Sequence, residues 1–282
     1  MLTRHREPSP DCLPVNPSIP PSAVESPSLL VTFVNHSTVL LQQPGLNILT
    51  DPVWSERASP VSFLGPRRHR LPGIEFDRLP PIHAVLLSHN HYDHLDLPTL
   101  RRLAASRQQP IFVAPLGLDR YLESRGITPA RQLDWGDSLA VPGATIHAVP
   151  AIHFSGRSPF DRNQTLWSGY VIQSAFGAIY FAGDTGFGPH FAWIRDRFGA
   201  PRLALLPIGA YEPRWFMSPV HMNPEEALEA HRILGATTSI AIHHGTFQLA
   251  DEAIDAPRRR LLACEGGDSF RVLENGQCAL LA

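Results

Sequence analysis

The feature that most constrains this chain is a stretch in which an apolar run gives way to a cluster of metal-binding side chains. In VLLSHNHYDHLD, residues 85–96, four such side chains occur within six positions: His89, His91, Asp93 and His94. Residues two apart in an extended segment share a side, so His89 and His91 can point to one centre. Asp93 and His94 come where the chain turns toward a predicted helix, and they can point to a second centre close by.

A site of this kind needs more ligands than one stretch supplies. Four candidates follow later apolar runs: His153 in VPAIHFSG, Asp184 in YFAGDTG, and the neighbouring His243 and His244 in AIHHGTF. Imidazole nitrogen and carboxylate oxygen suit Zn²⁺, with Mn²⁺ or Fe²⁺ as alternatives. An anionic Asp184 between two cations could bridge them. The competing interpretation of the first stretch is a polar loop with solvated histidines, since motif matches carry a false-positive rate.

Short apolar runs separated by turn residues predict strands from residue 29 onward. These strands cover 29–35, 38–43 and 46–51 (a β-meander), 83–88, 111–115, 144–151, 166–174, 178–184, 203–209 and 238–244, and a closing hairpin over 269–281 turns at Asn275-Gly276. Helices are predicted at 97–106, 116–126, 188–198, 223–234 and 249–263. This order fits two mixed sheets packed face to face, with helices outside.

Capping signals mark two of the helix starts. Asp96 precedes a helix with Pro98 in its first turn, and Asn223 precedes Pro224. Before the first strand, residues 1–28 contain seven prolines and are expected to form an extended or disordered arm, with a strap packed on the domain as the alternative. Residues 29–282 are expected to form one domain.

The amino-acid composition limits the classes of binding partner and the cellular compartment that we expect for this chain. A net charge of −2 provides no overall electrostatic attraction to nucleic acid, so no nucleic-acid partner is expected. All 24 basic residues are Arg, whose planar fork suits phosphate and carboxylate. The three cysteines lack metal-like spacing and fit a reducing compartment. Without an 18-residue apolar run, we expect a cytoplasmic protein, with peripheral membrane contact left open.

Taken together, the motifs resemble a known family. The order H-x-H-x-D-H, then a later His, an Asp and a His, each at a strand end, is similar to the metallo-β-lactamase superfamily. More narrowly, SHNHYDHLD, LTDPVWSERASP, GAYEPRWFM and HMNPEEA resemble its N-acyl-phosphatidylethanolamine phospholipase D branch and the bacterial relatives of that branch, over about residues 33–250. The resemblance implies an αβ/βα four-layer sandwich of two mixed β-sheets, which agrees with the predicted elements.

The resemblance also implies a role for each position of the site. It divides the ligands between two Zn²⁺ ions: His89, His91 and His153 for the first, Asp93, His94 and His243 for the second, and Asp184 as the bridge. Asp51, in LTDP, would lie outside the ligand set and orient one of the metal ligands. His36, in NHST, would have a structural or supporting role. His243 is preferred over His244 by the family pattern, and neighbouring strand residues face opposite ways.

Substrate contacts are less well specified. Arg67 and Arg68, in the cationic stretch GPRRHR, could receive a phosphate, and the alternative is a solvated turn. Tyr211 and Arg214, in YEPRWFM, could line the mouth of a pocket, although aromatic residues are more often part of a core. The resemblance suggests that His221 donates to a leaving group, and the alternative is a capping or surface histidine.

The expected chemistry follows from the metals. Two cations about 3.5–4 Å apart share a water and lower its pKa toward ~7, which yields a bridging hydroxide. The leading hypothesis is a phosphodiesterase of phospholipase D type acting on a small-molecule or lipid phosphodiester, with Asp93, Asp184 and His221 taking part in the chemistry. A lactonase or other ester or amide hydrolase is the first alternative, and a non-catalytic metal-binding scaffold is the second. The oligomeric state is not specified by the sequence.

Overall fold

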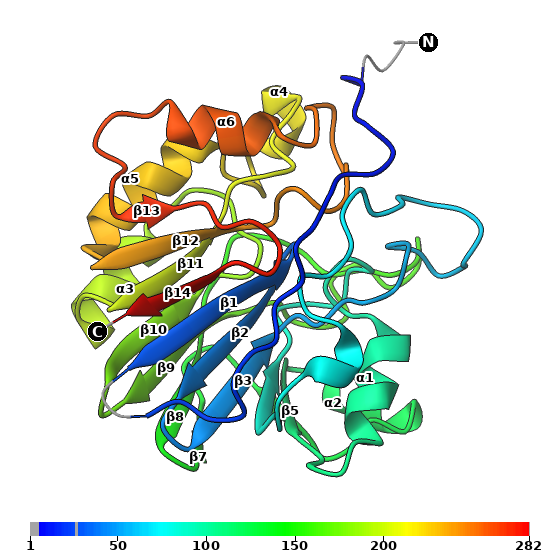
Figure 1. The fold of residues 1–282 in the computed structure, drawn as a ribbon, viewed down its shortest axis with the longest axis vertical. Helices are drawn as coiled ribbons and strands as arrows, with labels where there is room; N and C mark the ends of the chain where they lie inside the picture. The colour runs from blue at the N-terminus through cyan, green and yellow to red at the C-terminus, as the bar shows by residue number, and fades with distance from the viewer. Residues whose placement is uncertain (1–5, 26–27, 282) are drawn as a thin grey trace.

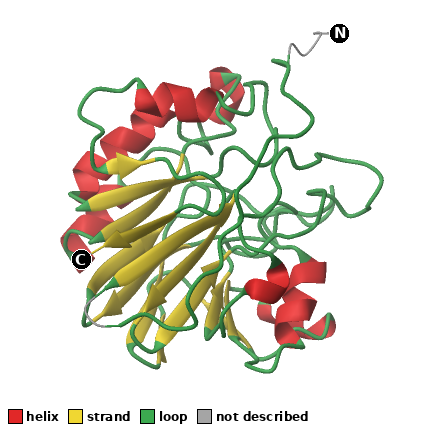
Figure 2. Cartoon of the chain, in the orientation of Figure 1, coloured by secondary structure: helices red, strands yellow, loops and turns green. Residues whose placement is uncertain are grey.

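Two β-sheets packed face to face, with helices on their outer sides, make up the computed structural model, which describes residues 6–25 and 28–281 (Figure 1, Figure 2). In spatial order, the first sheet holds seven strands: β14 (Cys278–Leu281), β1 (Leu29–Asn35), β2 (Thr38–Gln43), β3 (Leu46–Thr50), β4 (Ala84–Leu86), β5 (Ile111–Pro115) and β6 (Ala130–Leu133). The second also holds seven: β13 (Phe270–Arg271), β12 (Thr238–Ile242), β11 (Leu203–Pro207), β10 (Gly177–Phe181), β9 (Gly169–Ser174), β8 (Ala144–Val149) and β7 (Ser138–Val141). The predicted αβ/βα sandwich is confirmed.

Each sheet changes from antiparallel to parallel pairing partway across. The strands β1, β2 and β3 form the predicted antiparallel meander, whereas β3, β4, β5 and β6 run parallel. In the second sheet, β7 to β10 are antiparallel and β10 to β13 are parallel. Parallel strands end at the same edge, so the residues that follow β3 and β4 are neighbours, as are those that follow β10, β11 and β12.

Alternation along the strands builds three apolar layers. In β11, Leu203 and Leu205 pack between the sheets, whereas Ala204 and Leu206 pack outward against the helices. In β4, Leu86 faces the inter-sheet core and Val85 the outer layer. Strands buried on both faces appear as continuous apolar runs in the sequence. Each fully buried large aliphatic side chain contributes about 1.5–3 kcal/mol.

The helices lie on the outer faces of the two sheets (Figure 2). They are the 3₁₀ helix η1 (Phe76–Arg78), α1 (Leu97–Ala104), α2 (Asp119–Ser124), α3 (His190–Phe198), α4 (Arg214–Met217), α5 (Pro224–Leu234) and α6 (Ala256–Leu262). The predicted cap of α5 is confirmed: Asn223 and Glu226 form a reciprocal capping box. Within the described part of the chain, none of these helices has both the length and the apolar character to span a bilayer.

Asp96, the predicted N-cap of α1, forms hydrogen bonds other than those expected of a cap. Asp96 stands at the N-cap position, but its side chain caps no backbone N–H of the helix. Its carboxylate instead accepts from the backbone N–H groups of Trp54 and Ser55 at 3.1 and 3.0 Å and from the Thr99 hydroxyl at 2.6 Å. Asp96 therefore ties the loop after β3 to the start of α1.

Three other features differ from the sequence predictions. The closing hairpin is wrong, because β13 pairs with β12 in one sheet and β14 pairs with β1 in the other. The Asn275-Gly276 pair therefore lies in a crossing between sheets. The strands β6 and β7 were not predicted, since each is only four residues long and includes two exposed residues. The last predicted helix is shorter than 249–263, because only α6 is helical there.

The described part of the N-terminal arm, residues 6–25, adopts the alternative form, a strap. Backbone N–H groups of Glu7, Leu13 and Ser18 donate to carbonyl oxygens of Asp251, His69 and Gly73, at 2.8, 2.7 and 2.8 Å. Further along, Gln42 in β2 donates to the Pro21 carbonyl at 2.8 Å. The arm thus crosses from the first sheet to the loop that follows β12 (Figure 1).

Replacing Gly276 should destabilise the fold more than replacing a comparable glycine. Gly276 has φ +88°, and an added Cβ would lie 2.4 Å from the carbonyl oxygen of Asn16 on the strap. Gly143 has φ +80° with nothing within 4 Å of an added Cβ. Gly143→Ala should cost about 1–2 kcal/mol, the penalty of a left-handed residue, and Gly276→Ala should cost more because a collision is added. Midpoints of urea unfolding measure both, and equal losses would contradict the packing described here.

Candidate metal centre

Segments that are far apart in the sequence deliver side chains to one place at the strand ends. Seven of the expected site residues meet there: His89, His91, Asp93 and His94 after β4, His153 after β8, Asp184 after β10 and His243 after β12. His36, from the turn between β1 and β2, and His221, from the loop before α5, join them. Most of these side chains are buried, with only His91 half-buried.

The first group consists of three histidines. Nε2 of His89 lies 2.7 Å from Nδ1 of His91, and Nε2 of His153 lies 3.3 Å from that same atom. Two ligands about 2.0–2.1 Å from one zinc at a tetrahedral angle are about 3.3 Å apart. The distance from His153 to His91 matches this spacing, and the distance from His89 to His91 is shorter and lies in the range of a hydrogen bond.

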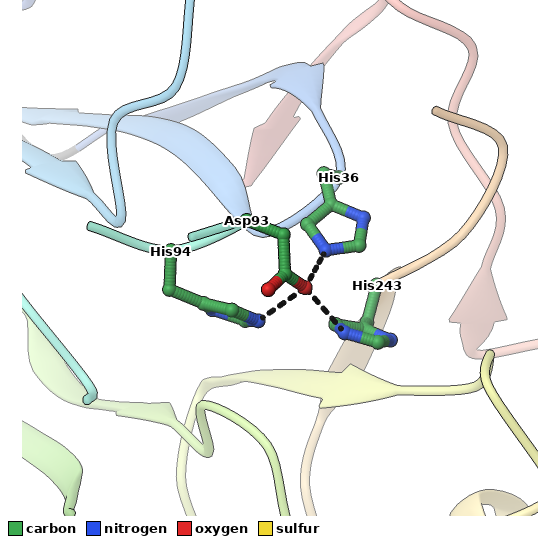
Figure 3. A group of neighbouring side chains, drawn as sticks. All are labelled: His36, Asp93, His94 and His243. Atoms are coloured by element: carbon green, nitrogen blue, oxygen red, sulfur yellow. Dashed lines mark hydrogen bonds and ion pairs between the residues drawn. The ribbon is translucent and has the colours of Figure 1, made fainter. Parts of the chain in front are cut away.

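The second group surrounds one carboxylate oxygen (Figure 3). Oδ2 of Asp93 is 2.9 Å from Nε2 of His36, 3.1 Å from Nε2 of His94 and 3.3 Å from Nε2 of His243. The four side chains come from three separate segments and point toward a common centre (Figure 3). The sequence pattern suggested only a supporting role for His36, and its contact with Asp93 is compatible with orienting that carboxylate.

Asp184 lies between the two groups. Its Oδ2 is 3.0 Å from Nε2 of His243, 3.2 Å from Nε2 of His94, 3.8 Å from Nε2 of His153 and 4.0 Å from Nδ1 of His221. One carboxylate thus reaches members of both groups, as a bridging residue must.

The unpaired atoms in this cluster fit divalent cations. Nε2 of His94, Nε2 of His243 and Oδ1 of Asp184 are buried and find no hydrogen-bond partner among the described residues. A buried polar atom without a partner costs free energy that a metal bond removes. Imidazole nitrogens and carboxylate oxygens at this spacing match the donor sets of Zn²⁺, Mn²⁺ and Fe²⁺.

A buried Asp51 accepts hydrogen bonds at the outer side of the cluster. Its carboxylate accepts from Nδ1–H of His94 at 2.6 Å, from the Ser88 hydroxyl at 2.5 Å and from the Ser88 backbone N–H at 2.7 Å. The Ser88 oxygen also lies 2.9 Å from Nδ1 of His89. Because Asp51 and Ser88 engage the Nδ1 atoms, both imidazoles turn Nε2 toward the centre. His153 is fixed in the same way, since its Nδ1–H donates to the carbonyl of Val220 at 3.0 Å.

Burial and charge set the protonation of the cluster. Burial lowers the pKa of His89 and of His153 well below 6.5, so both stay neutral and able to bind a metal. Burial opposes ionisation of Asp184, but the charges of His243 and His94 outweigh it and hold the Asp184 pKa well below 3.8. Burial also lowers the pKa of His221 to about 4, so near neutral pH it is an uncharged imidazole with one N–H to donate.

Three residues of the site have left-handed backbone geometry. The φ angles are +48° at His36, +31° at Asp51 and +58° at His243. Such angles are uncommon for residues with a side chain and cost about 1–3 kcal/mol each. They turn the chain sharply just beyond the strands, which aims these side chains at the centre.

The residues expected to contact substrate have internal partners instead. Arg68 is buried and donates to the carbonyl oxygens of Val53 at 3.1 Å and Ser55 at 2.8 Å. Arg67 is exposed and pairs with Glu56 at 2.5 Å.

Two further residues expected to contact substrate have partners on the helices α5 and α6. Tyr211 is buried, with the guanidinium of Arg260 5.1 Å from its ring centroid. Arg214 pairs with Glu226 at 2.8 Å. Neither of these contacts leaves a hydrogen-bond donor visibly reserved for an anionic substrate.

Sequence reasoning missed Ser88 and the direct contact of His36 with Asp93. Ser88 is the last residue before the histidines, and nothing in its spacing marks it as a partner of Asp51 and His89. His36 approaches Asp93 across 57 positions of sequence, a contact that only the folded meander creates. His244 turns away from the centre and stacks on Phe33, with ring centroids 5.1 Å apart.

Two facing mixed sheets with a histidine and aspartate cluster at the strand ends define a class, the metal-dependent hydrolases of the αβ/βα sandwich fold. Residues 46–244 match the family model described as a beta-lactamase superfamily domain. This chain belongs to that family, in the N-acyl-phosphatidylethanolamine phospholipase D-like branch of the metallo-β-lactamase superfamily.

Individual relatives support this placement. The chain is 40% identical over 231 residues to N-acyl-phosphatidylethanolamine-hydrolyzing phospholipase D 1 of Caenorhabditis elegans, a match covering 78% of this chain and 65% of the relative. It is 38% identical to the mitochondrial enzyme of that name from Saccharomyces cerevisiae, covering 82% and 50%. Less than two thirds of each relative is therefore matched. A metallo hydrolase of the archaeon Ignicoccus hospitalis shares the fold, with a TM-score of 0.68, 23% identity and coverage of 90% and 99%.

Asp51→Asn should weaken metal binding without unfolding the protein. The substitution keeps the shape of the side chain but removes the negative charge that accepts from His94, and losing such a partner typically costs about 10–100-fold in metal affinity. Titration of zinc against a competing chelator measures the change. Asp77→Asn, at an exposed surface pair with Arg102, is the control and should leave the affinity unchanged. Equal affinities for Asp51→Asn and the native chain would contradict the orienting role.

Proposed function

We propose that this chain is a hydrolase that uses two divalent cations, with zinc the leading choice and manganese or iron(II) the alternatives. The first ion is assigned to His89, His91 and His153, the second to Asp93, His94 and His243, and the bridge to Asp184. The observation that carries the proposal is the position of Asp184, whose Oδ2 lies within 4.0 Å of imidazole nitrogens from both groups.

Each part of the cluster has a separate task in this proposal. When bound, two such cations supply the acidity that ionises water near neutral pH and neutralise negative charge on a reacting ester. Asp93 and Asp184 remain ionised and hold the two groups of imidazoles at fixed spacing. His221 presents a neutral N–H toward the centre and donates a hydrogen bond to an oxygen of the substrate.

Charge balance favours a phosphodiester as substrate. Two carboxylates and one ionised water offset three of the four charges of two divalent cations, and the remaining ligands are neutral imidazoles, so the loaded centre carries a net charge of about +1. An anionic phosphodiester gains more from this charge than a neutral ester does. The names of the curated relatives, which are phospholipases of the D type, support the same substrate class. A lactonase or other ester or amide hydrolase is the alternative at the same site.

Metal loading should switch on phosphodiester hydrolysis. Elemental analysis should find two zinc ions per chain, and the loaded protein should hydrolyse bis(p-nitrophenyl) phosphate faster than a lactone. Asp184→Ala should lose bound metal and turnover together, because the bridging residue is removed. Asp196→Ala, an exposed residue of α3, is the matched control. Turnover by thoroughly chelated protein would refute the proposal, whereas faster turnover of the lactone would support the alternative.

We also propose peripheral contact with a lipid surface, consistent with the cytoplasmic location expected from the sequence. Trp215 and Phe216 of α4 are 79% and 60% exposed, and Phe63 and Leu64 in the loop after β3 are 78% and 67% exposed. Figure 1 shows α4 at the top of the molecule and the long loop after β3 at its right edge. Exposed aromatic and aliphatic groups of this kind are typical of surfaces that enter the headgroup region of a bilayer.

Removing the aromatic residues of α4 should weaken vesicle binding. Burying one aromatic ring contributes about 1.5–3 kcal/mol, so Trp215→Ser with Phe216→Ser should lower partitioning to phosphatidylcholine vesicles by about tenfold or more. Co-sedimentation measures this partitioning. Trp193→Ser, which changes a 40% exposed residue of α3, should not alter it. No vesicle binding by the native chain, or equal binding by all variants, would contradict the membrane proposal.

A further inference from the structure

An ion pair beside the metal centre has no role in the chemistry described so far. Nη2 of Arg214, in α4, donates to both carboxylate oxygens of Glu226 at 2.9 and 2.8 Å. Nη1 of the same guanidinium donates to the carbonyl oxygen of His221 at 3.0 Å. The two side chains are only 26% and 33% exposed. One planar guanidinium therefore joins α4, α5 and the loop between them, an arrangement that needs several donors in fixed directions.

Glu226 is itself fixed by the helix that it caps. Its Oε2 accepts from the backbone N–H of Asn223 at 3.0 Å, and Oδ1 of Asn223 accepts from the backbone N–H of Glu226 at 2.8 Å. This reciprocal pair begins α5, which packs its apolar side against the second sheet. Arg214 is thus anchored, through Glu226, to a rigid element of the fold.

The loop held by Arg214 makes three contacts at the metal centre. The carbonyl of Val220 accepts from Nδ1–H of His153 at 3.0 Å, and Nδ1 of His221 lies 4.0 Å from Oδ2 of Asp184. The backbone N–H of Met222 donates to the carbonyl of Thr185 at 3.1 Å. Nδ1 of His221 is buried and has no hydrogen-bond partner in the part of the chain that the structure describes. The loop therefore presents a free imidazole nitrogen at a fixed distance from Asp184.

We propose that Arg214 is a positioning residue, which acts through its ion pair with Glu226 to hold the His221 imidazole against the metal centre. This inference rests on the proposed hydrolase function and extends it. An anionic substrate would have to displace Glu226 to reach the guanidinium, so direct substrate contact by Arg214 is disfavoured. A hydrogen bond weakens steeply as its angle departs from linearity, so His221 can assist only if its loop is held in one place.

A double-mutant cycle tests whether Arg214 works through His221. We would measure turnover of a soluble phosphodiester by the zinc-loaded full chain with Arg214→Ala, His221→Ala and both changes. Loss of one preorganised donor typically lowers kcat by about 10²–10³-fold, and His221→Ala should fall in that range with KM little changed. Arg214→Ala should show a smaller loss in the same parameter. The double variant should lose no more than His221→Ala alone, because residues that act as one unit are not additive.

Controls separate positioning from general damage. Arg232→Ala removes an exposed ion pair with Glu229 on the same α5 helix and should leave kcat unchanged. Arg214→Lys keeps the charge but cannot bind Glu226 and the His221 carbonyl together, so it should restore only part of the activity. Zinc content should be the same in all these variants. Additive losses in the double variant would overturn the proposal.

A second measurement does not depend on turnover. Amide hydrogen exchange over residues 218–222 should be faster in Arg214→Ala than in the native chain and unchanged in Arg232→Ala, because only the first loses the tie to the loop. If the native protein hydrolysed no ester, the proposed function would be refuted. The rate of amide hydrogen exchange over residues 218–222 would still show whether Arg214 fixes the loop. Unchanged exchange in Arg214→Ala would show that the loop is held by other contacts and would refute the inference.

Discussion

The interaction on which this structure depends is the attraction between buried imidazoles and two buried carboxylates around one centre. Asp93 and Asp184 have no basic side chain opposite them in the described structure other than histidines. Burying so many titratable groups is costly unless each is bonded or shares a metal. The parallel halves of the two sheets make the arrangement possible, because their strands end beside one another and supply ligands from opposite layers of the sandwich.

Close backbone packing keeps the ligands from relaxing away from the centre. An added Cβ on Gly209 would lie 2.1 Å from the carbonyl oxygen of His243, and one on Gly183 would lie 2.6 Å from Cβ of Ser88. Glycine is thus required where two site-bearing loops touch. Gly209 packs against the carbonyl oxygen of His243, so the fold leaves the backbone at this left-handed residue little room to relax.

Local patterns predicted the elements but not their long-range pairing. Apolar runs located most strands, and Asn223 with Pro224 located the start of α5, because these signals act within a few residues. The pairing of β14 with β1 depends on a crossing between sheets, which no turn motif encodes. At the site, the ligand types were visible in the H-x-H-x-D-H spacing, whereas the bond from Ser88 to Asp51 was not, since it joins residues 37 positions apart and only the folded sheet brings them together.

The cationic motifs of this chain have partners inside the fold, and the chemistry of arginine explains why. In a chain without lysine, every permanently cationic side chain is an arginine with five donors in a planar fork, and several of these forks bind backbone carbonyls of loops. Arg68 donates hydrogen bonds to the carbonyls of Val53 and Ser55. Arg157 donates to the carbonyls of Asn90 and Leu95 at 2.7 and 2.9 Å. Arg214 donates to the carbonyl of His221. Each of these guanidinium groups stabilises the conformation of a loop that carries or flanks the candidate metal centre. In the proposed function, recognition of an anionic substrate would depend mainly on the charge of the loaded centre, and an Arg-rich motif in such a chain predicts loop rigidity as readily as phosphate binding.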